Sequence, residues 1–297
     1  MEGYSAYQAD SSRKMRFRRV KRNTTLETGE KRAKLRSMKF PTLALAAILT
    51  LPTTHAQNQA KAEWIPENTK IVPGQTFRTV IRLTVDEGWH TYWENPGEGG
   101  LPIKAIAELP EGWTLGSIQF PAPKAFMTGP LHGFGYEGEI LFPLTITPPP
   151  GSEATEFPQG IVPKITWLTC SEKRCVPGKA EPTLSAPDPD LVAKAYDSLP
   201  KEIPGASLAF DTSGDTVKLS LALAADSQLE PASWTIFPVN QNVIDPSSTP
   251  TFVKDVEKAE AWTAVAPKSE YLDGAPDSIS LVLVDSSGKA WFVTSAQ

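Results

Sequence analysis

The only two cysteines of this 297-residue chain, Cys170 and Cys175, lie five positions apart. They follow a segment typical of a buried strand, and Pro177 comes two positions after the second cysteine. A four-residue spacer of this kind suggests a tight loop or hairpin that brings the two sulfurs together. Because paired cysteines outside the cytoplasm can persist as a disulfide, the chemistry open to this pair is thiol–disulfide exchange or a purely structural cross-link.

The charges around the cysteines favour a reactive pair. Lys173, Arg174 and Lys179 give the loop a local excess of positive charge, which Glu172 offsets in part. Nearby cations lower the pKa of a thiol, so we expect Lys173 and Arg174 to tune the thiolate. A structural role is weakened by the short spacing, because closing a loop this small stabilises a fold by only roughly 2 kcal/mol. The residues alone leave both alternatives open.

A metal site is the competing chemistry, because His90 and His132 are the only histidines beyond residue 56. Two cysteines with two histidines are a possible ligand set for copper or zinc. Neither histidine has a partner at ligand spacing, so we assign no metal ligand and expect no cofactor. The segment 133–138 matches G-x-G-x-x-G, but an alternating segment follows where a dinucleotide site needs a helix. We expect its glycines to form a turn that leads into a strand at 139–147.

The first 56 residues have the pattern of an export signal. Twelve Lys and Arg residues precede one apolar run at 40–51, and Thr54-His55-Ala56 supplies small residues for cleavage. The run is shorter than the ~20 residues that span a bilayer, so we expect cleavage near Ala56 and no stable membrane insertion. Residues beyond 56 carry 17 Lys and Arg against 30 Asp and Glu, a net charge of about −13. Nucleic acid is therefore disfavoured as a partner.

Beyond residue 56, apolar and polar residues alternate as they do in half-buried strands. The alternating segments are residues 77–85, 140–146, 161–167, 217–223 and 279–283. Turn signals rich in Pro and Gly separate them. The pattern predicts an all-β fold built from antiparallel β-sandwiches.

One segment departs from the alternation. Asp188 can cap a helix that has Pro189 in its first turn, and apolar residues follow at helical spacing. We expect a short linker helix within residues 187–204. It would divide a first β domain at 57–186, which holds the cysteines, from a second, smaller β domain at 205–297.

The aromatic-rich segment 88–97 allows two interpretations. Its tryptophans suit the core of a sandwich, and Asn95-Pro96-Gly97 suits a turn. Alternatively, the segment is part of a partner-binding rim, where Tyr and Trp are common. We favour the core interpretation.

Four motifs in the same order resemble the N-terminal periplasmic domain of the thiol:disulfide interchange protein DsbD and its copper-sensitivity-suppressor relatives. They are the aromatic segment 88–97, the turn 120–123, the segment 135–138 with the strand after it, and the segment 167–177 around the cysteines. The resemblance covers about residues 64–184. It implies an immunoglobulin-like sandwich in the periplasm.

The resemblance also implies how the cysteines act. In such domains the pair receives electrons from a membrane partner and hands them to oxidised periplasmic proteins. Cys175 would form the mixed disulfide, and Cys170 would resolve it. A loop that shields the sulfurs corresponds to residues 128–135, with Leu131 or Phe134 as the candidate lid side chain.

Longer family members add a multi-span membrane domain and a terminal thioredoxin-like domain, and we expect neither in this chain. The expected partners are therefore thioredoxin-fold periplasmic proteins and a separate membrane electron carrier. The resulting hypothesis is an exported thiol:disulfide interchange module, an oxidoreductase of the protein-disulfide reductase type if active. The alternatives are a non-catalytic binding or scaffold sandwich with a structural disulfide, and a copper-binding protein.

Overall fold

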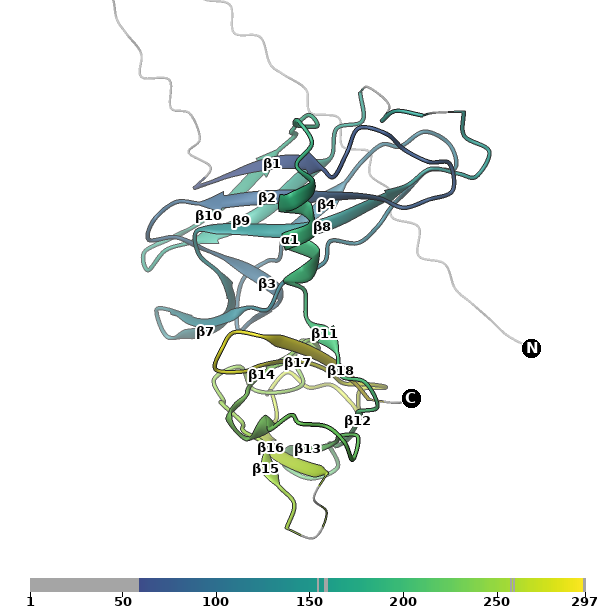
Figure 1. Cartoon of the computed structure of the whole chain (residues 1–297). Helices are drawn as coiled ribbons and strands as arrows, with labels where there is room; N and C mark the ends of the chain where they lie inside the picture. Colours follow the sequence, from purple (N-terminus) through teal and green to yellow (C-terminus); the bar gives the residue numbers. More distant parts are fainter. Residues whose placement is uncertain (1–58, 154, 158–159, 257, 259, 296–297) are drawn as a thin grey trace, which may run out of the picture. The chain divides into compact units, whose positions relative to one another are not determined.

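The structure is a computed structural model that describes residues 59–153, 155–157, 160–256, 258 and 260–295. In this part of the chain, 18 strands form four sheets, and a single α-helix follows the first two sheets in the sequence and precedes the other two (Figure 1). The expected all-β fold is confirmed. The expected signal peptide, residues 1–56, lies outside the described residues. No helix in the described part is long and apolar enough to cross a membrane.

The first sheet has four antiparallel strands. In spatial order they are β1 (Ala60–Pro66), β2 (Phe77–Val85), β8 (Glu139–Thr147) and β5 (Thr114–Leu115). The alternating apolar residues predicted at 77–85 and 140–146 fall within β2 and β8, where they are buried on one face. Period-two burial is what a sheet with one covered face requires.

The second sheet carries the cysteines. Its strands are, in spatial order, β10 (Cys175–Ala180), β9 (Lys164–Cys170), β3 (His90–Gly97), β7 (Leu131–Tyr136) and β6 (Lys124–Thr128), with β4 (Lys104–Ile106) also pairing with β9. All of these pairings are antiparallel. The two cysteines therefore stand at one edge of the sheet, on neighbouring strands.

The two sheets enclose a common core, which we call the N-terminal sandwich. Trp64 of β1 and Trp93 of β3 are both fully buried in it, one from each sheet. Trp64 Nε1 donates to Thr79 Oγ1 at 3.0 Å, and that hydroxyl donates to the Leu144 carbonyl at 2.7 Å. Buried polar groups are costly unless they are paired, so this chain of hydrogen bonds lets a tryptophan fill the centre of the core.

The helix α1 (Pro189–Asp197) follows the N-terminal sandwich in the chain and packs on the outer face of its first sheet (Figure 1). The Asp188 side chain accepts a hydrogen bond from the Leu191 backbone N–H at 2.9 Å, which is the predicted cap. Val192 is fully buried against Val80. The expected helix is present, and it is part of the packed structure.

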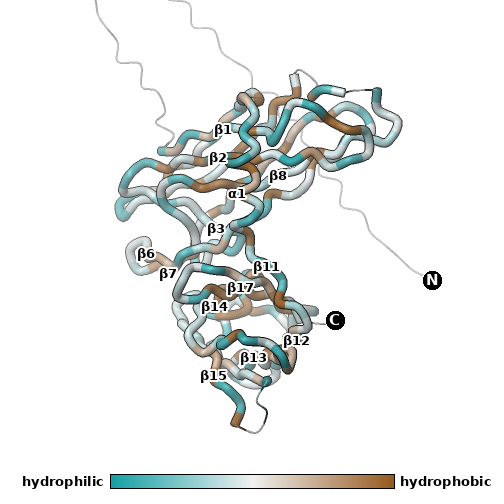
Figure 2. Tube along the Cα trace, in the orientation of Figure 1, coloured by the Kyte–Doolittle hydropathy of each residue, from teal (hydrophilic) through white to brown (hydrophobic). Residues whose placement is uncertain are grey.

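Two further four-stranded sheets form the C-terminal half. One contains β11 (Lys201–Glu202), β18 (Ala290–Thr294), β17 (Ser280–Val284) and β14 (Thr235–Pro238), and the other contains β12 (Ser207–Asp211), β13 (Thr216–Ala222), β16 (Ala261–Pro267) and β15 (Val253–Lys254). A single 3-10 turn, η1 (Pro231–Ser233), precedes β14 in the described residues. Figure 2 shows hydrophobic colour along β17, a central strand of the first of these sheets, and along β14, which lies at its edge.

These sheets enclose a second core, but several of their residues, Phe237 among them, pack in the first core. Trp234 and Trp291 stack with ring centroids 4.2 Å apart in the C-terminal core. Phe237 of β14 lies 6.2 Å from the Trp93 ring and 5.5 Å from the Phe134 ring, centroid to centroid. The division of the chain at residues 187–204 therefore stays a prediction.

Two expected turns are strands instead. Asn95, Pro96 and Gly97 are the last residues of β3, with a register shift before them. Gly133 and Gly135 lie within β7, and only Gly138, with φ +70°, forms the turn before β8. The strand expected at 139–147 is confirmed. The turn prediction is confirmed for Gly138. It was wrong for Gly133 and Gly135, where glycine is needed because the Phe126 side chain lies close to the strand.

Candidate functional site

Cys170 and Cys175 form a disulfide at the end of the β9–β10 hairpin. Cys170 is the last residue of β9, Cys175 is the first of β10, and the two are directly opposite in the antiparallel register. The four-residue loop is closed by the Ser171 N–H, which donates to the Arg174 carbonyl at 2.9 Å. The hairpin itself therefore holds the two cysteines next to each other.

The two cysteines differ in burial. Cys170 has no exposed surface, whereas Cys175 is an exposed residue. A sulfur is attacked only where another sulfur can reach it along the S–S axis. Of the two cysteines, Cys175 is therefore the one that offers surface to a second protein.

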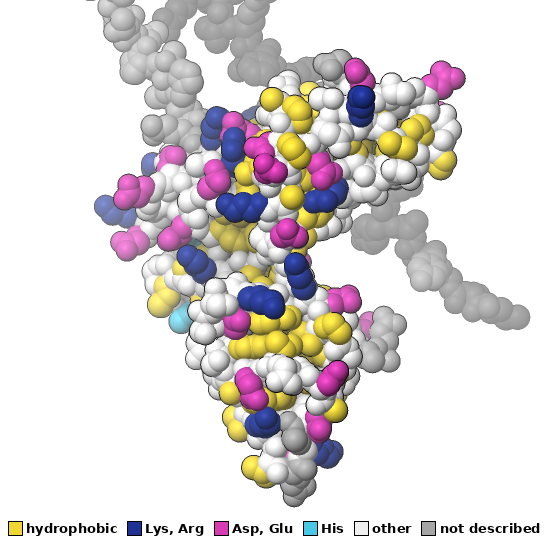
Figure 3. All heavy atoms as spheres, viewed as in Figure 1, with side chains coloured by type: hydrophobic (Ala, Val, Ile, Leu, Met, Phe, Trp, Pro, Cys, Tyr) yellow, Lys and Arg dark blue, Asp and Glu magenta, His cyan; other side chains and the backbone are white. Residues whose placement is uncertain are grey.

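The basic residues of the loop are exposed. Lys173 and Arg174 lie between the cysteines, and the Arg174 guanidinium lies over the Trp89 ring at 5.5 Å from its centroid. This cation–π contact places a positive charge beside the exposed end of the hairpin. On the face shown in Figure 3, basic and acidic side chains are interspersed.

An aromatic row, which we define as His90, Tyr92 and Phe126, adjoins the buried cysteine on the outer face of the sheet. His90 is directly opposite Cys170 in the β3–β9 register, so their side chains share one face. The His90 and Phe126 ring centroids are 4.1 Å apart, and those of Tyr92 and Phe126 are 5.6 Å apart. Phe126 is opposite Gly133, where any side chain would collide with its ring.

Burial shifts the ionisable groups of the aromatic row. His90 and Tyr92 are both buried, with 7% and 3% of their surface exposed. Burial lowers the pKa of His90, and the negative charge of Glu137 opposes this effect. Burial also raises the pKa of Tyr92, which a hydrogen bond from Thr128 opposes. Both rings are therefore uncharged near neutral pH.

The two candidate lid residues lie in different environments. Leu131 is at the tip of the β6–β7 hairpin and is 44% exposed. Phe134 is 5% exposed and packs against Trp93 in the core. Since Phe134 is opposite Ala125 and Gly133 is opposite Phe126, the Phe134 ring is on the face of the sheet away from the aromatic row.

The sequence interpretation did not single out Phe126 or Tyr92, and it considered His90 only as a metal ligand. The spacing of His90 and Tyr92, two positions apart in a strand, was a signal that they share a face. The position of Phe126 over two glycines of a neighbouring strand had no signal of its own. In the described part of the chain, no group of three or more His, Cys, Asp or Glu side chains is placed to hold a metal ion.

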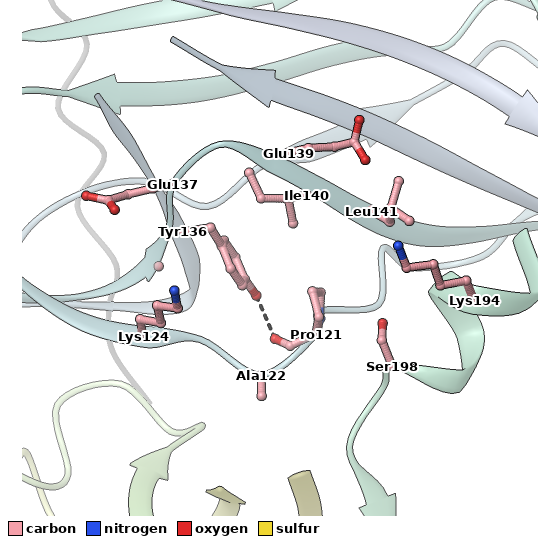
Figure 4. A pocket seen from close by; sticks show the side chains of 11 residues that line it. Pro121, Ala122, Lys124, Tyr136, Glu137, Glu139, Ile140, Leu141, Lys194 and Ser198 are labelled. Carbon is pink, nitrogen blue, oxygen red and sulfur yellow. Dashed lines mark hydrogen bonds between the residues drawn. The ribbon is translucent and has the colours of Figure 1, made fainter. Parts of the chain in front are cut away.

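A pocket of about 330 Å³ opens beside the second sheet, between β7, β8 and α1. Figure 4 shows Lys124 and Glu137 at one end and Lys194 of the helix at the other. At its floor the Tyr136 hydroxyl donates to the Pro121 carbonyl at 2.7 Å. Its charges are of both signs and neither cysteine lines it, so we assign it no ligand.

Comparison with known proteins identifies the cysteine-bearing half. Residues 61–187 match the family described as thiol:disulfide interchange protein DsbD, N-terminal. A solved structure, the N-terminal periplasmic domain of ScsB from Proteus mirabilis, is similar with a TM-score of 0.60 and 20% sequence identity, over 84% of this chain and 97% of that one. A search of curated proteins finds no match. The likeness in fold thus extends beyond residues 61–187.

Proposed function

Residues 61–187 belong to the DsbD N-terminal domain family, and on that premise we propose that this chain is a thiol:disulfide exchange module of the periplasm. The observation that carries the proposal is the unequal burial of the two cysteines on one hairpin. Cys175 is exposed, whereas Cys170 is completely buried. Exchange needs one sulfur that a partner reaches and a second that is protected until the first has reacted. A structural cross-link needs no such difference.

The proposed reaction is a pair of sulfur displacements. A partner thiolate attacks Cys175 Sγ, a bond forms between these two sulfurs, and the electron pair of the broken disulfide stays on Cys170 Sγ. The second thiolate of the partner then attacks the partner's own sulfur in the mixed disulfide, and Cys175 leaves as a thiolate. The partner is oxidised by two electrons, and the Cys170–Cys175 pair is reduced. The same steps in reverse reduce an oxidised protein, with Cys170 resolving the mixed disulfide.

We further propose that Lys173 and Arg174 lower the pKa of the Cys175 thiol. Both side chains are exposed, so their effect is small and is screened by salt. In a Cys170→Ser protein, replacing both with Gln should raise the Cys175 pKa by less than about one unit. The ultraviolet absorbance of the thiolate, followed against pH at low and high salt, measures this change.

The lid is proposed to be the β6–β7 hairpin. Leu131 lies at its tip, and the Phe126 ring contacts the His90 ring, which is opposite Cys170. Phe126 therefore takes the place of Phe134, whose ring faces the core. Phe126→Ala should speed the reduction of the disulfide by dithiothreitol, whereas Phe134→Ala should lower the free energy of unfolding.

The proposed partners are thioredoxin-fold proteins and a separate membrane electron carrier. The family description, a thiol:disulfide interchange protein, supports this class of partner. Both partners would meet the same sulfur, Cys175, so the two encounters are expected to exclude each other. Excess of one partner should then slow the reaction with the other.

A trapped mixed disulfide tests the proposed function. Cys170→Ser leaves Cys175 as the single thiol, and the probe is a thioredoxin-fold protein whose only cysteine is activated as an aromatic mixed disulfide. We expect a covalent adduct with Cys170→Ser and at least tenfold slower adduct formation with the matched control Cys175→Ser, whose remaining thiol is buried. Equal rates for the two variants, or no adduct, would refute the assignment of Cys175.

The alternative function is an inert disulfide in a binding or scaffold sandwich. The reduction potential of the pair in the folded protein separates the two. A value below about −300 mV is typical of structural disulfides, and a higher value is typical of exchange proteins.

A further inference from the structure

The proposed exchange places a negative charge on the buried cysteine, Cys170, in both directions of electron transfer. If the proposed function is correct, Cys170 carries a thiolate after the first displacement, and again before it resolves a mixed disulfide. Cys170 has no exposed surface, and burying an uncompensated charge is unfavourable. The fold must therefore supply a hydrogen-bond donor to this sulfur, or the thiolate would rarely form.

His90 is the polar side chain that the sheet places opposite Cys170. Directly opposite residues of an antiparallel pair have Cβ atoms roughly 5 Å apart and point to the same side. An imidazole on one of them is long enough to reach a sulfur on the other. His90 is itself 7% exposed, so water competes little for its N–H.

Two hydroxyls lie next to one nitrogen of the His90 ring. Nε2 lies 3.0 Å from Thr128 Oγ1 and 3.4 Å from the Tyr92 hydroxyl. If one of these hydroxyls donates to the single lone pair of Nε2, the proton of the neutral ring resides on Nδ1. The Phe126 ring, 4.1 Å from the imidazole centroid, restricts the ring's orientation.

We propose that His90 is the positioning residue for the buried sulfur, with its Nδ1–H donating a hydrogen bond to the Cys170 thiolate. The inference rests on the proposed function but adds a residue to it. The His90 proton is not transferred in this step: the imidazole stays neutral, and the negative charge stays on Cys170 Sγ. The donor makes the thiolate a better leaving group and a more abundant nucleophile, so it assists both directions of exchange.

Other ionisable groups on this face are compatible with a neutral donor. Tyr92 is on the same strand, Glu137 follows β7 and Lys124 belongs to β6. Burial lowers the pKa of His90 more than Glu137 raises it. The imidazole is therefore uncharged near pH 7, as a hydrogen-bond donor without proton transfer requires.

A titration of the single thiol tests the inference. In a Cys175→Ser protein the only thiol is Cys170, and the ultraviolet absorbance of its thiolate gives its pKa. His90→Leu should raise this pKa by about one unit or more, a tenfold loss of thiolate. His90→Asn, whose amide N–H occupies the place of Nδ1, should restore most of the loss, whereas His90→Gln should not. His132→Leu, on the same hairpin as the lid, is the matched control and should leave the pKa unchanged.

Two results of this titration would overturn the inference: an unchanged Cys170 pKa in His90→Leu, or rescue by Gln and not by Asn. A measurement on the wild-type protein keeps the test independent of how the variants fold. Nitrogen NMR of His90 should show the Nδ1–H tautomer, and its Nδ1 signal should shift when the disulfide is reduced. An Nε2–H tautomer contradicts the proposal. None of these measurements uses a partner protein, so a failed adduct test with a successful titration would reject the exchange function and keep the donor.

Discussion

The stability that the Cys170–Cys175 disulfide contributes can be worked out from the loop that it closes. The bond joins residues five positions apart, at adjacent places of a hairpin that is paired along its whole length. In the chain-entropy description, a loop of this size restricts the unfolded chain by about 2 kcal/mol. For a protein of this size, a loss of that magnitude lowers Tm by roughly 4–8 °C. We therefore expect the reduced protein to stay folded.

Urea unfolding followed by tryptophan fluorescence, with and without a phosphine reductant, measures this difference. Reduction replaces no residue and only converts the disulfide to two thiols, so the comparison isolates the bond. Cys175→Ala is the control, because the reductant should have no effect on it. If reduction lowered the free energy of unfolding by more than about 4 kcal/mol, or unfolded the protein, the disulfide would be a structural element on which the hairpin depends. The exchange function would then lose its main physical support.

Three further predictions concern the surroundings of the site. Gly178→Ala should destabilise the protein by about 1–3 kcal/mol in urea unfolding, because its Cβ would lie 2.3 Å from the Trp167 ring. Asn95→Ala should lower the free energy of unfolding by about 1–3 kcal/mol, because the buried Asn95 Nδ2–H donates to the Pro238 carbonyl at 2.7 Å; a Tm equal to that of wild type contradicts this. Burial raises the pKa of Tyr196 from 10.0 to about 12; the Arg78 guanidinium opposes this rise, and the Glu67 carboxylate adds to it. The stabilisation that comes from keeping the Tyr196 hydroxyl protonated is present below pH 10 and is lost between about pH 10 and 12. The free energy of unfolding of wild type should therefore fall more over this pH range than that of Tyr196→Phe.

Much of the fold follows from local patterns in the sequence. Alternation at 77–85 and 140–146 predicts β2 and β8 because burial on one face of a sheet repeats every second residue. Asp188 and Pro189 predict the helix start because capping and a fixed φ act within one turn. These signals are readable because the forces behind them operate between residues close in the chain.

The functional face is different, because it depends on pairing between distant strands. His90 meets Cys170 only through the register of β3 with β9, which eighty positions of chain separate. Phe134 was a candidate lid side chain because the resemblance places the shielding loop at residues 128–135, yet one position along a strand moves a side chain to the opposite face. Composition and spacing alone do not determine which face of the sheet Phe134 occupies; the register of β6 with β7 does.

The glycines beneath Phe126 have a consequence for the tolerance of this protein to mutation. A Cβ on Gly135 would lie 1.9 Å from the Thr91 carbonyl oxygen and 2.9 Å from the Phe126 ring, and one on Gly133 would lie 2.8 Å from the same ring. An alanine at either position displaces the ring that holds His90, although the cysteines are more than thirty residues away in sequence. A genetic screen for loss of exchange should therefore recover substitutions at these two glycines in alleles whose cysteine codons are intact.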